Sequence, residues 1–344
     1  INHRYNQIEV PALNIGGWYD LFLHGTLENF VRMGQEGGSD LSQKGQRLLV
    51  GPWAHAAFSG IFPDHSFGIS SSADIVDLTD LQLRFFAHHL KGETTSIEQE
   101  SPVRIFVMGE NRWRDEEEWP LDRTQYVPWY LHSSGDAGDS GGSLSPEGPS
   151  LEARDVYLYD PRNPAPTIGG PTFLPGLLLG ANAGPRDQSP VEARPDVLVY
   201  SSAPLEQPLE VTGPLTVKLH AATSASDTDF VVRLCDVYPD GVSRILAEGI
   251  LRARFREGYS QPRPIEPDRV YEYEINLVAT SHVFQAGHRI RVDVTSSSFP
   301  RFDRNPNTGK PLGEDGWEDL QPALQTIFHD SERPSHILLP VIPR

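Results

Sequence analysis

Two short motifs near the start of the sequence end in side chains that acid–base chemistry could use. Asp20 closes the stretch GGWYD, and His55 closes the stretch GPWAH. Each motif follows a short apolar run typical of a buried strand, VPALNI before the first and RLLV before the second. Ligands of an open α/β sheet bind in the crevice outside the carboxyl ends of its parallel strands. We therefore expect Asp20 and His55 to face the same crevice.

A carboxylate that holds an imidazole is the acid–base part of a Ser-His-Asp triad. His55 Nε2 would take the proton of a serine hydroxyl and return it to the leaving group, while Asp20 would accept a hydrogen bond from Nδ1–H. The separation of 35 positions between Asp20 and His55 leaves room for one helix and a loop between adjacent strands. An acid followed by a histidine is also the later part of the order Ser, Asp, His found on α/β-hydrolase sheets.

Each motif taken alone also has a purely structural interpretation. An aspartate at the start of a helix is often its N-cap, and an isolated histidine is often a packing residue. His24 lies one helical turn beyond Asp20 and is expected only to cover the helix. It is the pairing of Asp20 and His55 at two strand ends that favours catalysis.

Ser140 lies in the stretch GDSGG, which satisfies the G-x-S-x-G pattern of a nucleophile elbow. That elbow requires a strand that enters and a helix that leaves, and no apolar run flanks Ser140 on either side. The chymotrypsin order His, Asp, Ser could also be drawn, but it needs two β-barrels. We expect Ser140 to be a linker residue, with no nucleophile in this chain.

The elements that must position Asp20 and His55 alternate between strand and helix. Strands are predicted over residues 10–15, 47–50 and 102–108, and helices over residues 20–33 and 75–90, the second ending at Gly92. This alternation is typical of a mostly parallel sheet with helices on its faces.

The character of the sequence changes after residue 132. Residues 133–150 are rich in Gly and Ser and are predicted to form a linker. Residues 151–344 contain short alternating runs separated by Pro, Gly and Asp turns, typical of an antiparallel sandwich or jelly roll. The predicted fold class is therefore α/β over residues 1–132, followed by an all-β domain over residues 151–344.

Several longer stretches resemble the serine hydrolase family that includes cocaine esterase, α-amino-acid ester hydrolases and X-Pro dipeptidyl-peptidases. VPALNIGGWYDLF is similar to the acid motif of that family, LLVGPWAH to its histidine motif, and SSSFPRFDRNPNTG to part of its C-terminal jelly roll. The resemblance extends over nearly the whole chain. It implies that Asp20 is the acid, that His55 is the base, and that Phe22 lines the acyl pocket.

The chain departs from this family because the nucleophilic serine, the oxyanion-hole groups and a helical cap precede the acid motif in the family. Only nineteen residues precede Asp20 here. We therefore expect residues 1–344 to be the C-terminal portion of an α/β-hydrolase with its jelly roll, inactive alone but part of an ester or amide hydrolase.

Composition narrows the possible partners. The 344 residues carry a net charge of −18, which argues against nucleic acid, because a phosphate backbone needs a basic face. No uninterrupted apolar run of about 18 residues is present, so no membrane span is expected. The single cysteine, Cys235, rules out an internal disulfide and only slightly favours a cytoplasmic address. We expect no cofactor and no metal, and a small ester, amide or peptide as substrate.

A second hypothesis is a non-catalytic β-sandwich that binds another molecule, such as a carbohydrate, and carries a remnant α/β segment. A binding platform of that kind should present a row of exposed aromatic side chains on one sheet face. The tyrosines of the second half are scattered over separate predicted strands, which does not discriminate between the hypotheses: Tyr157, Tyr159, Tyr200, Tyr271 and Tyr273. The acid and histidine motifs favour the enzyme.

Overall fold

The structure is a computed structural model that describes residues 4–173 and 182–343. It is mostly β-sheet with few helices, and it divides into two compact units. The first unit comprises residues 1–124, 171–184 and 281–283, and the second comprises residues 125–170, 185–280 and 284–344.

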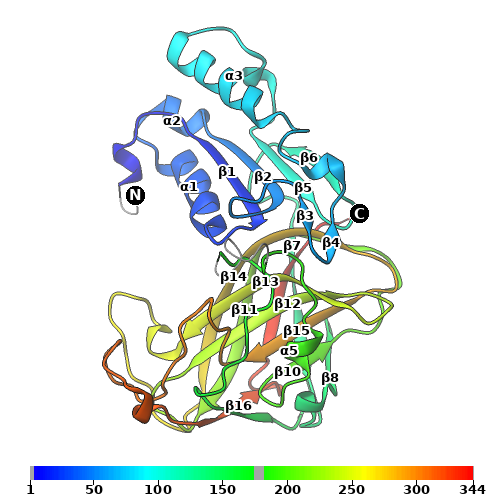
Figure 1. Cartoon of the computed structure of the whole chain (residues 1–344), viewed down its shortest axis with the longest axis vertical. Helices are drawn as coiled ribbons and strands as arrows, with labels where there is room; N and C mark the ends of the chain where they lie inside the picture. Colours follow the sequence, from blue (N-terminus) through cyan, green and yellow to red (C-terminus); the bar gives the residue numbers. More distant parts are fainter. Residues whose placement is uncertain (1–3, 174–181, 344) are drawn as a thin grey trace. The chain divides into compact units, whose positions relative to one another are not determined.

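The first unit is built around a four-stranded sheet in the order β1-β2-β5-β6. β1 pairs with β2 and β2 with β5 in parallel, whereas β5 and β6 are antiparallel. Figure 1 shows these strands with α1, α2 and α3, drawn in blue to cyan. The described helices and strands of this unit are η1 (Tyr5–Gln7), β1 (Leu13–Tyr19), α1 (Leu23–Glu36), α2 (Asp40–Lys44), β2 (Arg47–Ala54), β3 (Ile61–Phe62), β4 (His65–Ser66), η2 (Ile69–Ser71), α3 (Leu78–Lys91), η3 (Ser96–Gln99), β5 (Val103–Val107) and β6 (Arg112–Glu116).

The predicted strand–helix alternation is confirmed, with shifts of a few residues at the element ends. α1 buries its apolar stripe of Leu23, Leu27, Phe30 and Met33, and it contacts β1. α3 ends at Gly92 in the left-handed conformation, as the sequence predicts. Both β1 and β2 continue past the glycines that were expected to end them.

The close approach of two backbones explains why β1 continues through Gly17. A Cβ added there would lie 2.3 Å from the carbonyl oxygen of Trp53 on β2. Trp18 and Trp53 then anchor the two strands, since their indole N–H groups donate to the buried carbonyls of Phe106 and Ser71, both at 2.7 Å. A residue with no side chain is therefore what allows β1 and β2 to stay paired as far as Asp20 and His55.

The second unit contains an eleven-stranded sheet among the residues described. Its order is β13-β12-β15-β10-β8-β7-β17-β11-β16-β9, with β14 paired to β11. All of the described pairings within it are antiparallel except that of β8 with β10. The elements are β7 (Gln125–His132), η4 (Ala137–Asp139), β8 (Gly142–Ser145), β9 (Asp155–Tyr159), α5 (Ser189–Glu192), β10 (Leu198–Ser201), β11 (Leu209–Thr223), β12 (Asp229–Val237), β13 (Ser243–Arg252), η5 (Ala253–Phe255), β14 (Tyr271–Phe284), β15 (Arg289–Thr295), η6 (Trp317–Asp319), β16 (Ala323–Phe328) and β17 (His336–Val341).

The structure differs from the sequence prediction at residues 133–150, which were expected to form a linker. They contain β8, which pairs with β7 on one side and β10 on the other. Leu144 of β8 is buried, and Ser133 donates a hydrogen bond to the buried Asp155 at 2.9 Å. Two buried apolar side chains, Ala137 and Leu144, and a few long-range hydrogen bonds therefore hold a Gly- and Ser-rich segment in the sheet.

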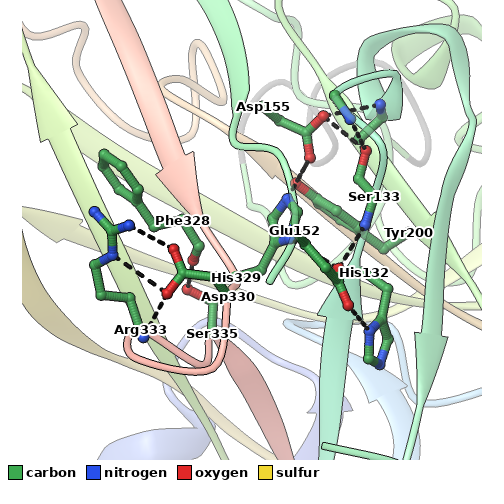
Figure 2. A network of polar contacts seen from close by, with 12 residues as sticks. His132, Ser133, Glu152, Asp155, Tyr200, Phe328, His329, Asp330, Arg333 and Ser335 are labelled. Atoms are coloured by element: carbon green, nitrogen blue, oxygen red, sulfur yellow. Dashed lines mark hydrogen bonds and ion pairs between the residues drawn. The ribbon is translucent and has the colours of Figure 1, made fainter. Parts of the chain in front are cut away.

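A network of polar side chains fixes this region (Figure 2). His329 is completely buried, and its two ring nitrogens face Glu152 Oε2 at 3.3 Å and Asp155 Oδ2 at 2.8 Å. Glu152 also pairs with His132 at 2.8 Å. His329 directly follows β16 and Asp155 begins β9, so these contacts tie the ends of two paired strands together.

Burial alone would raise the pKa of Asp155. Hydrogen bonds from His329, the backbone of Ala137, Tyr200 and Ser133 outweigh that effect, and the pKa of this carboxyl is lowered. The pKa of Glu152 is also lowered, because hydrogen bonds from His132 and from the backbone of Ser133 outweigh its burial. Both groups therefore favour the ionised form in the folded state.

This network predicts that acid destabilises the second unit. A carboxyl group with a lower pKa in the folded state stabilises the fold above its unfolded pKa, about 4, and that stability is lost as the pH falls through the folded value. We expect the free energy of unfolding, measured with urea, to decrease below about pH 4. The loss should be smaller in Glu152→Gln, although that variant is less stable at pH 7.

The matched control is Glu147→Gln, which changes an exposed carboxyl group in the same segment. Its acid dependence should equal that of the wild type. An identical pH dependence of the wild type and Glu152→Gln would contradict the role of the network.

Candidate functional site

The first unit brings Asp20 and His55 together. Asp20 is the residue after β1, and His55 is the residue after β2, at the same edge of the parallel pair. His55 Nδ1 lies 3.2 Å from Asp20 Oδ2, within hydrogen-bonding distance. The contact expected from the two motifs is therefore present in the structure.

Asp20 is held in one orientation by its own backbone turn. Its second carboxylate oxygen, Oδ1, accepts a hydrogen bond of 2.8 Å from the backbone N–H of Phe22, and its carbonyl accepts one of 3.1 Å from Leu23. The carboxylate thus caps the turn that leads into α1 and also faces His55. The N-cap of α1 is Phe22, which has no side-chain capping bond, so Asp20 lies before the cap. One oxygen of Asp20 fixes the turn and the other faces His55.

His55 is presented by a sharp reversal of the chain after β2. Ala56 adopts the left-handed conformation with φ 59°, and the backbone N–H of Ala57 donates to the carbonyl of Ala54 at 3.0 Å. The His55 side chain remains 35% exposed, against 16% for Asp20. In the part of the chain that the structure describes, no residue forms a hydrogen bond with Nε2 of His55, so this nitrogen is open to a further group.

Two phenylalanine rings contact the imidazole with their edges. The Phe22 ring centroid lies 5.1 Å from that of His55 at an interplanar angle of 78°, and Phe173 lies 5.0 Å away at 77°. Phe22, which the family resemblance places in the acyl pocket, is 59% exposed beside the imidazole. These edge contacts place two aromatic side chains against the imidazole ring.

Phe173 is the residue of this group that the sequence did not reveal. It lies in the stretch GGPTF, far from both motifs along the chain and outside any predicted strand or helix. No periodicity or motif distinguishes it from other phenylalanines. Its relation to His55 depends on the fold of the unit, which local patterns do not encode.

Ser140 has a different environment. It follows the short helix η4 in the left-handed conformation, with φ 62°, and it is exposed. The strand β8 begins two residues later, and no helix leaves Ser140. The strand–turn–helix of a nucleophile elbow is therefore not formed at this serine.

One group of described residues has metal-ligand types close together: Glu192, Cys235 and Asp293, with donor atoms within 4.8 Å of one another. Burial and the nearby Asp293 raise the pKa of the Cys235 thiol, and burial with the nearby Glu192 raises that of Asp293 well above its usual range. Both groups thus tend to keep their protons, whereas a metal ligand must lose them. Glu192 is already paired with Arg291. The group is a buried polar cluster whose charge is balanced within the protein.

No helix in the described part of the chain has the length and apolar character required to cross a membrane.

Comparisons with known proteins place the chain among hydrolases. The family model described as X-Pro dipeptidyl-peptidase C-terminal non-catalytic domain matches residues 95–338, and the model of X-Pro dipeptidyl-peptidase (S15 family) matches residues 1–57. The chain is 43% identical over 343 residues to cocaine esterase of Rhodococcus sp. (strain MB1 Bresler), covering 99% of this chain and 58% of that protein.

Solved structures agree with this assignment. An aminopeptidase from a marine sediment Thaumarchaeota archaeon superposes with a TM-score of 0.85 at 31% identity, over 98% of this chain and 56% of that one. An α-amino acid ester hydrolase superposes with a TM-score of 0.82 at 30% identity, over 97% of this chain and 56% of that one. The chain spans somewhat more than half the length of these relatives. It belongs to the family that includes the X-Pro dipeptidyl-peptidases, cocaine esterase and the α-amino acid ester hydrolases.

Proposed function

We propose that this chain supplies the acid and the base of a Ser-His-Asp triad to an acyl hydrolase that acts on an ester, an amide or a peptide. Asp20 is the acid, His55 is the base, and Phe22 lines the acyl pocket. The nucleophilic serine comes from a hydrolase segment outside residues 1–344, and this chain alone is inactive.

The observation that carries the proposal is the contact of 3.2 Å between His55 Nδ1 and Asp20 Oδ2 at the carboxyl edge of β1 and β2. The other carboxylate oxygen is engaged by the backbone of Phe22, so the aspartate cannot turn away without losing that bond. The same residues fall within the match to the S15 family model, which covers residues 1–57. This contact favours the enzyme over the alternative of a non-catalytic β-sandwich module.

The geometry supports a defined path for the proton. With Nδ1–H donated to Asp20, Nε2 carries the lone pair and accepts the proton of the serine hydroxyl as it attacks the acyl carbon. Asp20 stabilises the imidazolium that forms. His55 then gives the proton from Nε2 to the leaving alcohol or amine, and a water molecule repeats the cycle to release the acid.

The domain assignment forms part of the proposal. The segment up to residue 124 is the C-terminal portion of an α/β-hydrolase domain, and the second unit, which includes residues 133–150, is a jelly-roll β-sandwich. The family model for a C-terminal non-catalytic domain supports the non-catalytic role of the later part.

The relatives support a small acyl substrate. Their names describe a cocaine esterase, an aminopeptidase and an α-amino acid ester hydrolase. All of these activities attack an acyl carbon with loss of an alcohol or an amine. We therefore propose an ester, amide or peptide bond as the target.

A reagent that reacts with an activated serine tests whether the nucleophile lies outside residues 1–344. Residues 1–344 alone should not release p-nitrophenol from p-nitrophenyl butyrate faster than free imidazole, and a fluorophosphonate should not label them. A longer hydrolase that contains these residues should do both, with the label outside residues 1–344. Labelling of Ser140, abolished by Ser140→Ala, would contradict the proposal.

A further inference from the structure

The second unit contains a hollow that the proposed hydrolase chemistry does not use. Its volume is about 500 Å³, within the usual size of small-molecule sites. It is lined by side chains of both charges and by one tryptophan: Arg252, Asp303, Arg304, Lys310, Asp315 and Trp317.

The loop that forms most of this hollow is tied down before any ligand binds. Asn305 Nδ2 donates to the buried carboxylates of Asp227 at 3.0 Å and Asp229 at 2.8 Å. Farther along the loop, Thr308 donates to Asp315 at 2.8 Å, and the backbone of Gln321 returns to Pro306 at 3.1 Å. These hydrogen bonds hold the loop and its side chains in one arrangement. A preorganised loop lowers the entropic cost of binding a ligand.

Carboxylates that do not line the hollow pair with most of its cationic side chains. Arg252 makes two hydrogen bonds to Asp229, at 2.8 and 3.0 Å, and Arg254 donates to Asp227 at 2.7 Å. Lys310 pairs with Asp319 at 2.7 Å. These pairs fix the direction of the remaining N–H groups and cancel most of the positive charge.

Arg304 and Asp303 add one charged group of each sign to the hollow, and Asp303 also interacts electrostatically with Arg252. Within residues 4–173 and 182–343, no carboxylate lies within ion-pair distance of Arg304, which donates only to the carbonyl of Pro161 at 3.3 Å. Asp303 is exposed beside it. An anion drawn to Arg304 would meet Asp303 and Asp315, and a cation drawn to these aspartates would meet Arg304. The hollow therefore suits a neutral ligand with both donors and acceptors.

Trp317 adds a flat apolar surface to these polar groups. It is 60% exposed, as is Leu312, which also lines the hollow. The guanidinium carbon of Arg304 lies 5.9 Å from the Trp317 ring centroid and 4.4 Å from that of Phe299, so the cation is steadied against two rings.

We propose that this hollow binds a neutral saccharide, with the C–H face of a pyranose ring stacked on Trp317. Hydroxyl groups both donate and accept hydrogen bonds, and they can satisfy Arg304 and Asp303 together. The electron-rich face of an indole attracts the weakly positive C–H groups of a sugar ring. This binding function is separate from the acid–base pair and uses neither Asp20 nor His55.

Calorimetric titration of the 344-residue chain with uncharged oligosaccharides tests the proposal. The probes are cellotetraose, maltotetraose, xylotetraose, mannotetraose and N-acetylchitotetraose, with inorganic phosphate and lysine as charged controls. At least one oligosaccharide should bind saturably, and neither charged control should compete with it. Failure of all five sugars to bind, or displacement by phosphate, overturns the proposal.

Variants locate the binding site. Trp317→Ala should weaken the binding by about tenfold or more, as truncation of a central aromatic contact does. Trp317→Phe should retain part of the affinity, and Asp303→Asn should weaken it several-fold with unchanged thermal unfolding. Tyr259→Ala is the matched control, because Tyr259 is 78% exposed in the same unit but does not line the hollow. Equal affinities of Trp317→Ala and Tyr259→Ala for the oligosaccharide would also overturn the proposal.

Discussion

Replacing His55 with alanine in a hydrolase that contains this chain is expected to lower kcat for a p-nitrophenyl ester by about 10⁴- to 10⁶-fold. The reason is geometric. Nε2 of His55 is the group positioned by Asp20 to accept the serine proton, and alanine offers no base in its place. KM should change little, since the imidazole removes a proton from the enzyme's own serine and does not bind the acyl chain.

Asp20→Asn should cost about 10⁴-fold in kcat, because an amide at this position favours the wrong tautomer of His55. The backbone N–H of Phe22 can still donate to the amide oxygen, so the fold of the turn should survive. Circular dichroism and thermal unfolding of this variant should match the wild type.

The matched control is His24→Ala. His24 lies on α1 near Asp20, and its side chain is 60% exposed, with Glu28 at 3.8 Å as an ion-pair partner. Its replacement should leave kcat within about twofold, as expected for an exposed side chain with no role in the reaction. A His55→Ala hydrolase that retains wild-type turnover would falsify the assignment of the base.

The contact between Asp20 and His55 could be predicted from the sequence because it needs only two facts. Both residues follow apolar runs of strand character, and parallel strands bring their carboxyl ends to one edge. Their separation of 35 positions fits one connecting helix, which is the observed α1 with the short α2. Strong local patterns and one topological rule therefore sufficed.

Other features depended on contacts between distant residues. The sequence predicts a turn at Gly16-Gly17, because glycine often ends a strand. β1 instead extends through Gly17, where the Trp53 carbonyl leaves no room for a side chain. Phe173 reaches His55 only through the tertiary fold. Residues 133–150 have the composition of a linker, yet Leu144 is buried in a sheet that contains strands from before and after it, and Ser133 binds Asp155. Composition indicates the conformations that a segment favours in isolation. The conformations of these segments are instead determined by the residues against which they pack.

The same dependence on distant partners applies to Glu248, a buried carboxylate on β13 in the second unit. Arg233 Nε donates to Glu248 Oε1 at 2.8 Å, and Arg301 donates to Oε2 at 2.7 Å. The side chains of Arg233 and Glu248 are 1% and 2% exposed. Burial alone would raise the pKa of Glu248, but the charges of Arg233 and Arg301 and a hydrogen bond from Ser298 outweigh it, and the pKa is lowered.

Glu248→Gln should reduce the free energy of unfolding at pH 7 by about 3–5 kcal/mol, the usual cost of leaving a buried charge without its partner. The variant keeps the shape of the side chain but leaves Arg233 with no compensating charge. Nη1 of this arginine already has no hydrogen-bond partner in the described structure, so it has little scope to recover the loss. Chemical denaturation with guanidinium chloride measures the difference.

Glu272→Gln serves as the control for charge alone. Glu272 is 51% exposed and lies 3.7 Å from Lys218 and 3.4 Å from His220, so solvent screens both pairs. Its replacement should cost less than about 1 kcal/mol. If Glu248→Gln lowers the free energy of unfolding no more than Glu272→Gln does, the buried ion pairs of Arg233 do not stabilise the pairing of β12 with β13. A larger loss for Glu248→Gln would show that burial, and not the number of ion pairs, determines how much a charge contributes to this fold.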